Sequence, residues 1–189
     1  MNATDLKKTY GYSVIGEQVK KILASDAATG DQFGYSVAAS NTRIVVCAPY
    51  EDTTGSDAGS AYIFDINGKQ FRKIQANDAA ANDYFGSAVA VSDTRIVVGA
   101  YGEDTTASDA GSAYIFDIYG NQLAKIQASD AAAGDNFGGS TFGGSAVAAS
   151  NTRIVVGSWS EDTTGSDAGS AYIFAVSYTH LTLPTNREV

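Results

Sequence analysis

Short apolar runs separated by polar turns recur along the chain, and they predict strands, not helices. Four such runs, "SVAAS", "RIVVCAP", "SAYIFDI" and "KQFRKIQA", lie within residues 36–76. The second and third runs are apolar at most positions, as expected for strands covered on both faces, whereas the fourth alternates like a half-exposed edge strand. The turns are short, and Asn67-Gly68 is a strong signal of a hairpin. This pattern predicts a four-stranded antiparallel unit.

The unit is repeated in tandem. The pairs Lys21-Ile22, Lys73-Ile74 and Lys125-Ile126 are 52 residues apart, and the third copy is six residues longer because "FGGSTFGG" duplicates its own segment. Four antiparallel strands in each repeat of about 50 residues predict an all-β fold built of β-propeller blades. A stack of parallel coils is the alternative, although its repeats are usually shorter and lack tight hairpins.

The repeat gives the expected domain boundaries. Residues 1–24 form a partial upstream blade containing a hairpin over Tyr10–Ala24, and residues 25–77 and 78–129 form complete blades. Residues 130–175 form a blade that lacks its last strand, and residues 176–189 resemble translated sequencing-adapter sequence, so we expect a non-native tail. A divergent last strand containing "HLTL" is the alternative for that tail. A seven-bladed ring would need about 360 residues, so we expect an incomplete, open arc.

The repeats resemble a known family. Phe33-Gly34 followed by Cys47-Ala48-Pro49 resembles the FG-GAP repeat of integrin α-chain propellers, and "SDAAAGDNFG" and "GSDAGSAYIF" are similar to bacterial FG-GAP repeats. Looser versions are Phe85-Gly86 with Gly99-Ala100-Tyr101, and Phe137-Gly138 with Gly157-Ser158-Trp159. The resemblance implies a propeller that commonly has seven blades, extracellular or cell-surface display, and binding without catalysis. The start of the chain contains no signal peptide pattern.

Charge is distributed unevenly. The chain has 12 lysines and arginines against 21 acidic residues, a net charge of −9, so nucleic acid and anionic membrane surfaces are poor partners. No apolar run approaches the length needed to span a bilayer, so membrane insertion is not expected. In an antiparallel meander, the loop between the second and third strands emerges on the same side as the loop entering the next blade. Both loops are acidic, and they hold 15 of the 21 carboxylates and no lysine or arginine. We expect this loop face to bind a protein or glycan, with the candidate residues Asp26, Asp31, Glu51, Asp78, Asp83, Glu103, Asp130, Asp135, Trp159 and Glu161.

Oxygen-rich loops also suit a hard cation, and Ca²⁺ is the candidate ion. The candidate ligands are Asp52, Asp57, Asp104, Asp109, Asp162 and Asp167. The alternative is that Asp57 caps its own loop by bonding local backbone amides. In the integrin pattern, calcium lies between the first two strands, where this chain has only short turns such as Ser40–Arg43. The resemblance therefore implies no calcium site at that place.

Catalysis is not expected. The only histidine, His180, lies in the tail, so no serine or cysteine has a histidine base, and Cys47 reads as a small buried strand residue. The sequence predicts a non-enzymatic extracellular binding or adhesion module. The alternatives are a structural spacer in a large surface protein and a fragment of a propeller hydrolase. An open arc also exposes strand edges, so we expect it to pair with further blades or to self-associate.

Overall fold

The computed structural model describes residues 16–139 and 146–176, and within them every regular element is a strand. Eleven strands follow in chain order. They are β1 (Val37–Ala39), β2 (Ile44–Ala48), β3 (Ser60–Phe64), β4 (Gln70–Ile74), β5 (Ala88–Val91), β6 (Arg95–Ala100), β7 (Ser112–Asp117), β8 (Gln122–Ile126), β9 (Val147–Ala149), β10 (Arg153–Ser158) and β11 (Ser170–Ala175). Those two ranges contain no helix that could span a bilayer.

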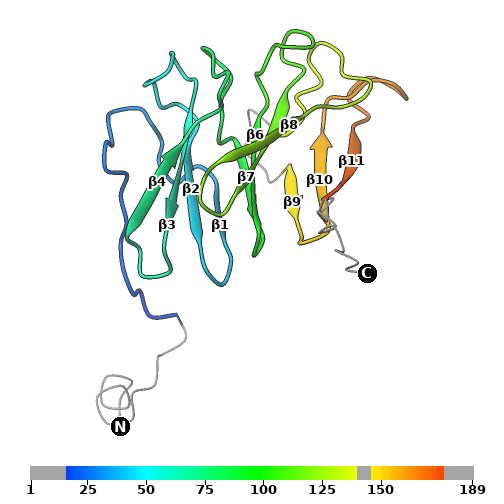
Figure 1. Ribbon diagram of the computed structural model, residues 1–189. Helices are drawn as coiled ribbons and strands as arrows, with labels where there is room; N and C mark the ends of the chain where they lie inside the picture. Colours follow the sequence, from blue (N-terminus) through cyan, green and yellow to red (C-terminus); the bar gives the residue numbers. More distant parts are fainter. Residues whose placement is uncertain (1–15, 140–145, 177–189) are drawn as a thin grey trace, which may run out of the picture.

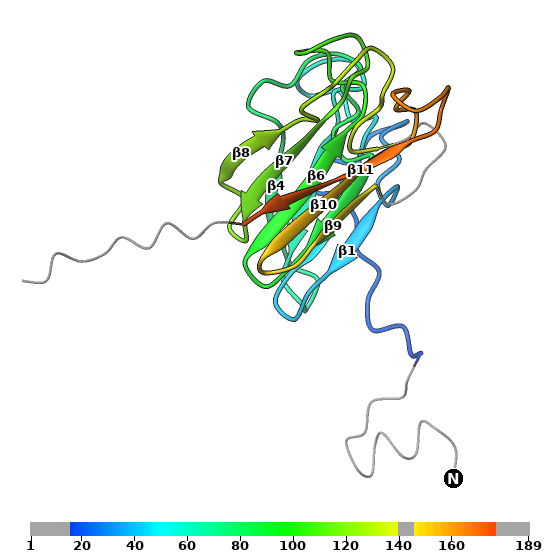
Figure 2. The ribbon, with the colours of Figure 1, turned by 90° about the vertical axis from the view of Figure 1, so that its right-hand side faces the viewer.

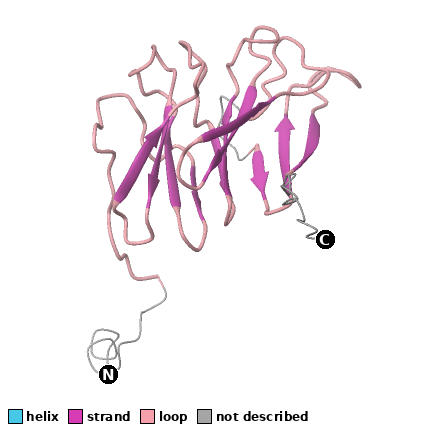
Figure 3. Cartoon of the chain, viewed as in Figure 1, coloured by secondary structure: helices cyan, strands magenta, loops and turns pink. Residues whose placement is uncertain are grey.

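The strands form three antiparallel meanders, which we call blades 1, 2 and 3 (Figures 1 and 3). Blade 1 has the order β1-β2-β3-β4, blade 2 the order β5-β6-β7-β8, and blade 3 contains β9-β10-β11. The two complete blades share one register, since Tyr62 lies opposite Lys73 and Tyr114 opposite Lys125. The predicted all-β propeller blades and the open arc are confirmed.

The blades pack face to face, and the core lies between them. Along β3, Ile63 faces blade 2, whereas Tyr62 and Phe64 face the opposite way and pack in a separate cluster. The strand is therefore apolar on both faces because both faces are covered. Cys47 is part of the core between blades 1 and 2, where burial raises the pKa of its thiol to about 12. The thiol is thus protonated and inert at neutral pH.

Backbone hydrogen bonds also join neighbouring blades. The amides of Tyr84 and Phe85, which enter blade 2, donate to the carbonyls of Asp57 and Ala58 in blade 1 at 3.0 and 2.9 Å. Gly59 permits this close approach, because its φ is +85° and a Cβ there would collide with the Phe85 carbonyl oxygen. The equivalent contact joins blades 2 and 3, where Phe137 donates to Ala110 at 2.9 Å.

The segment before blade 1 occupies the position of an outer strand. The first part of the predicted hairpin lies outside the described residues, and Gly16–Ala24 is not assigned as strand. The Lys20 ammonium donates to the carbonyls of Asn67 and Gly68 at 3.3 and 2.9 Å, and Ile22 and Ala24 pack in the cluster that contains Tyr62. Residues 16–24 therefore lie against blade 1 as β4 lies against blade 2. Of the predicted tail at 176–189, only Val176 is described, and its amide donates to the Thr152 carbonyl at 3.1 Å.

Candidate functional site

The acidic loops gather at one end of the arc, which we call the loop face. Figure 1 shows the β2–β3, β6–β7 and β10–β11 connections at the top, together with the loops that lead into the blades. Figure 2 shows the same arrangement from the side. This placement follows from the meander, because alternate connections of an antiparallel sheet emerge at the same end.

Six of the predicted binding residues on this face are buried, with exposed fractions of 3–6%. They are Asp31, Glu51, Asp83, Glu103, Asp135 and Glu161. The three aspartates repeat one contact, in which the carboxylate accepts a hydrogen bond from the backbone amide three residues earlier, at 2.7–2.8 Å. These carboxylates hold the entering loops in shape, so a partner at the surface would not touch them.

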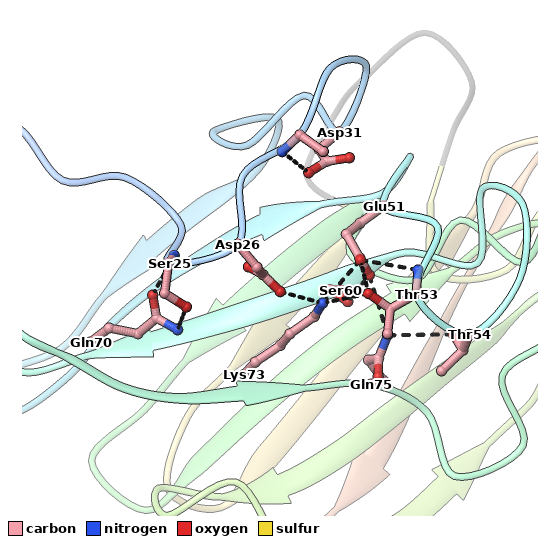
Figure 4. A network of polar contacts seen from close by, with 11 residues as sticks. Ser25, Asp26, Asp31, Glu51, Thr53, Thr54, Ser60, Gln70, Lys73 and Gln75 are labelled. Atoms are coloured by element: carbon pink, nitrogen blue, oxygen red, sulfur yellow. Dashed lines mark hydrogen bonds and ion pairs between the residues drawn. The ribbon is translucent and has the colours of Figure 1, made fainter.

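In blade 1, a lysine from the outer strand neutralises the loop carboxylates (Figure 4). Lys73 on β4 places its Nζ 2.7 Å from Asp26 Oδ2 and 3.0 Å from Glu51 Oε1. The second Glu51 oxygen accepts a hydrogen bond of 2.6 Å from the Ser60 hydroxyl, and the Thr53 amide donates to Oε1 at 3.0 Å. We call this arrangement the lysine clamp. It joins the entering loop, the β2–β3 loop and the outer strand.

Blade 2 repeats the clamp. Lys125 Nζ lies 2.8 Å from Asp78 Oδ2 and 2.8 Å from Glu103 Oε1, and Ser112 donates to Glu103 at 2.6 Å. Burial alone would raise the pKa of Glu103, but the bonds from Lys125, Ser112 and Thr105 outweigh it and hold the pKa below its usual range. The Lys125 pKa is raised by the same two carboxylates, against the effect of burial. The charged forms of both partners are therefore favoured.

Blade 3 has only part of the clamp among the residues described. Glu161 still accepts bonds from the Ser170 hydroxyl at 2.6 Å and the Thr163 amide at 2.7 Å. Asp130 accepts a bond of 2.8 Å from the Tyr172 hydroxyl. The strand that would carry the lysine is not present in residues 146–176, because blade 3 ends at β11.

The predicted metal ligands lie at the tips of the loops. Asp52, Asp104 and Asp162 are exposed, and each Oδ1 accepts the backbone amide of the residue five positions later, at 2.7–2.8 Å. Those later residues, Asp57, Asp109 and Asp167, have φ values of 51–53°. The first aspartate thus caps the loop, and the second supplies the amide. No three His, Cys, Asp or Glu side chains in the described ranges gather closely enough to share a metal ion, and calcium binding stays a prediction.

The comparison with protein families decides what kind of repeat this is. The FG-GAP repeat model matches residues 17–64, 69–116 and 121–174, so it covers most of the chain in three consecutive copies. The chain belongs to the FG-GAP repeat family. No curated protein sequence matches it. Among solved structures, the computationally designed Ika4 protein is 14% identical, with a TM-score of 0.35, over 86% of this chain and 100% of that chain.

The lysine clamp of these FG-GAP blades was not expected from the sequence. The acidic loops contain no lysine, but Lys73 and Lys125 reach them from outer strands that lie about 20 residues further along the chain. The signal was present in the Lys-Ile pair that recurs at intervals of 52 residues. The lysine occupies the same position of each alternating strand, and a buried glutamate recurs with the same period. This pattern indicates an ion pair between the two residues and not merely a solvent-exposed strand.

One buried FG-GAP carboxylate makes stability depend on pH. Burial raises the pKa of Asp83 to about 6, above its value of 3.8 in an unfolded chain. The folded protein therefore keeps this proton longer than the unfolded chain does, so stability falls as pH rises from about 4 through 6. We expect Asp83→Asn to raise the free energy of unfolding by about 2 kcal/mol at pH 8.

The asparagine carbonyl oxygen can still accept the bond from the Ala80 amide, so the change removes mainly the buried charge. Urea unfolding at a series of pH values measures the effect. We expect the two proteins to have similar stability at pH 4, and a difference that stays constant across the series would contradict a buried charge as the cause.

Proposed function

We propose that this arc of FG-GAP blades is a non-enzymatic binding module whose loop face contacts a basic surface on a partner protein. The observation that supports this most is the row formed by Asp52, Asp104 and Asp162, one exposed carboxylate at the same place in each blade. The ion pairs between described residues involve Lys73 and Lys125 and do not include Asp52, Asp104 or Asp162, so these three carboxylates are available to a partner.

Repetition makes such a surface effective. One exposed ion pair contributes at most about 1 kcal/mol, but contacts on successive blades are held on one rigid body and act together. The side chain of Trp159 is 43% exposed beside the same loops and can add apolar contact area. Binding of this kind weakens as salt is added, because exposed charges are screened.

The family resemblance supports display outside the cell, where adhesion modules meet their partners. A glycan is the other predicted ligand class, and a bridging cation would then link its hydroxyl groups to the loop aspartates. We favour a protein partner because each loop tip carries exposed charge only as carboxylates, which attract basic side chains directly.

The experiment uses a labelled oligo-lysine peptide as the probe. We expect the triple variant Asp52→Asn, Asp104→Asn, Asp162→Asn to bind it about tenfold more weakly in fluorescence anisotropy at low salt. Asparagine keeps the carbonyl oxygen that accepts the loop amide, so the loops should remain folded.

The control variant carries the same change of net charge at the opposite end of the blades. Asp65→Asn and Asp93→Asn lie in the β3–β4 and β5–β6 turns, and Asp117→Asn lies at the end of β7, where the β7–β8 turn begins. If both triple variants lost the same affinity, binding would reflect net charge alone and the loop face would not be the site. Binding that needs added calcium would instead favour the alternative in which a cation bridges the ligand and the loop aspartates, as expected for a glycan.

A further inference from the structure

The two ends of the arc expose the two halves of the interface that joins the blades inside the chain. On blade 3, the side chain of Ile173 is 71% exposed, whereas its counterpart Ile63 in blade 1 is fully buried against blade 2. On blade 1, Val37 is 65% exposed, whereas its counterparts Val89 and Val147 are 5% and 4% exposed because a preceding blade covers them. One end of the chain is therefore complementary to the other.

The glycines at these positions show the same complementarity. Gly86 and Gly138 lie against the preceding blade, so a Cβ on either would meet its atoms, whereas Gly34 has nothing within 4 Å. At the other end, a Cβ on Gly157 would meet only Ala146, of its own blade. The free surface of blade 1 and the free surface of blade 3 would form a third copy of a contact that the chain already makes twice.

Within residues 146–176, blade 3 has no outer strand, and the start of the chain can supply one. Residues 18–22, "QVKKI", align with β4 and β8, "QFRKI" and "QLAKI", and each run begins with glutamine and ends with Lys-Ile. Residues 18–22 pair with no strand among the residues described, although they lie against blade 1 as β4 lies against blade 2. Beyond β11, the sheet of blade 3 has no partner strand in those same residues.

The unmatched charges are complementary as well. Blade 3 holds Asp130 and Glu161, the two carboxylates of a lysine clamp, without the lysine of blades 1 and 2. Lys21 corresponds to Lys73 and Lys125 in the repeat, and its side chain is exposed. The lysine and the carboxylates that would complete one clamp thus lie at opposite ends of one chain.

We propose that a second copy of this chain docks on blade 3 and completes it with its own residues 18–22. In the register of the complete blades, Lys21 of the copy lies opposite Tyr172, as Lys73 lies opposite Tyr62, and its ammonium joins Asp130 and Glu161. The contact is head to tail. Two copies would close a ring of six blades, within the range of four to eight that propellers adopt.

Light scattering during size-exclusion chromatography tests the contact. We expect the chain to run at twice its 19.6 kDa mass. Ile173→Glu and Val37→Glu each place a charge on one half of the interface, and both positions are exposed in the single chain, so each variant should remain folded and monomeric. Mixing the two variants should restore one of the two contacts of the ring, between the intact blade 3 of one variant and the intact blade 1 of the other, and should give a heterodimer held by that contact alone.

Lys21→Met should weaken the dimer about tenfold, whereas Lys69→Met, an exposed lysine on the β3–β4 turn, should leave it unchanged. A monomeric wild-type chain would overturn the proposal. So would association that persists in both glutamate variants, which would indicate unspecific edge pairing. A chain that dimerises only after residues 177–189 are deleted would show that its own tail covers β11, and would also overturn it.

Discussion

Replacing Phe85 with alanine is expected to lower the free energy of unfolding by about 3–5 kcal/mol. The ring is fully buried between blades 1 and 2, with its centroid 5.6 Å from Tyr114 and 5.9 Å from Phe116 in edge-on contacts. Alanine would leave a cavity in the interface, and the backbone bond from Phe85 to Ala58 would prevent the blades from collapsing into it. Urea unfolding followed by circular dichroism measures the loss.

Phe33 provides a matched control for this prediction. It occupies the same position in blade 1 and makes the same edge-on contacts with Tyr62 and Phe64, at 5.4 and 6.1 Å. Among the residues described, no complete blade precedes it, and it is only half-buried. We expect Phe33→Ala to cost about 1–2 kcal/mol. Equal losses at the two positions would mean that stacking of blades adds nothing to the burial of this phenylalanine.

Replacing Lys125 with methionine is expected to lower the free energy of unfolding by about 2–3 kcal/mol at neutral pH, because Glu103 would remain buried without its cation. Since the folded-state pKa of Glu103 is lowered, the clamp contributes above the pKa of the unfolded chain and is lost as pH falls through the lower, folded value. The difference between the two proteins should therefore shrink in acid. Lys69→Met, at an exposed position, should change stability by less than about 0.5 kcal/mol.

A double variant separates the lysine clamp from simple loss of packing by the lysine stem. With Glu103→Gln already in place, Lys125→Met should cost less, because no buried carboxylate is left unpaired. Costs that simply add would show that Lys125 stabilises the blade through its apolar stem and not through its charge.

The strands were predictable from the sequence because burial leaves a direct pattern of residue types. The fully apolar β3 and the alternating β4 differ as an inner and an outer strand should, and the 52-residue repeat set their order. The role of the acidic loops was less accessible. Asp31 and Asp52 are both aspartates in loops, but the first is buried against a backbone amide and the second is exposed, and no sequence pattern distinguishes them.

Which loop carboxylates are paired depends on the direction in which neighbouring side chains point once the strands have formed. The sequence predicted one-sided charge, and the loops do lie at one end. It did not predict that Lys73 would reach across to Glu51, because that contact depends on the twist and register of β3 and β4. Long side chains from a neighbouring strand decide which charges remain available.

Each lysine clamp joins groups that one repeat supplies in order: first Asp26, then Glu51, and last Lys73. During synthesis, the ammonium leaves the ribosome after both carboxylates, so a nascent blade becomes cross-linked only when its own outer strand has emerged. The chain can then acquire its structure one blade at a time from the amino terminus, and each finished blade offers the next a formed surface on which to fold.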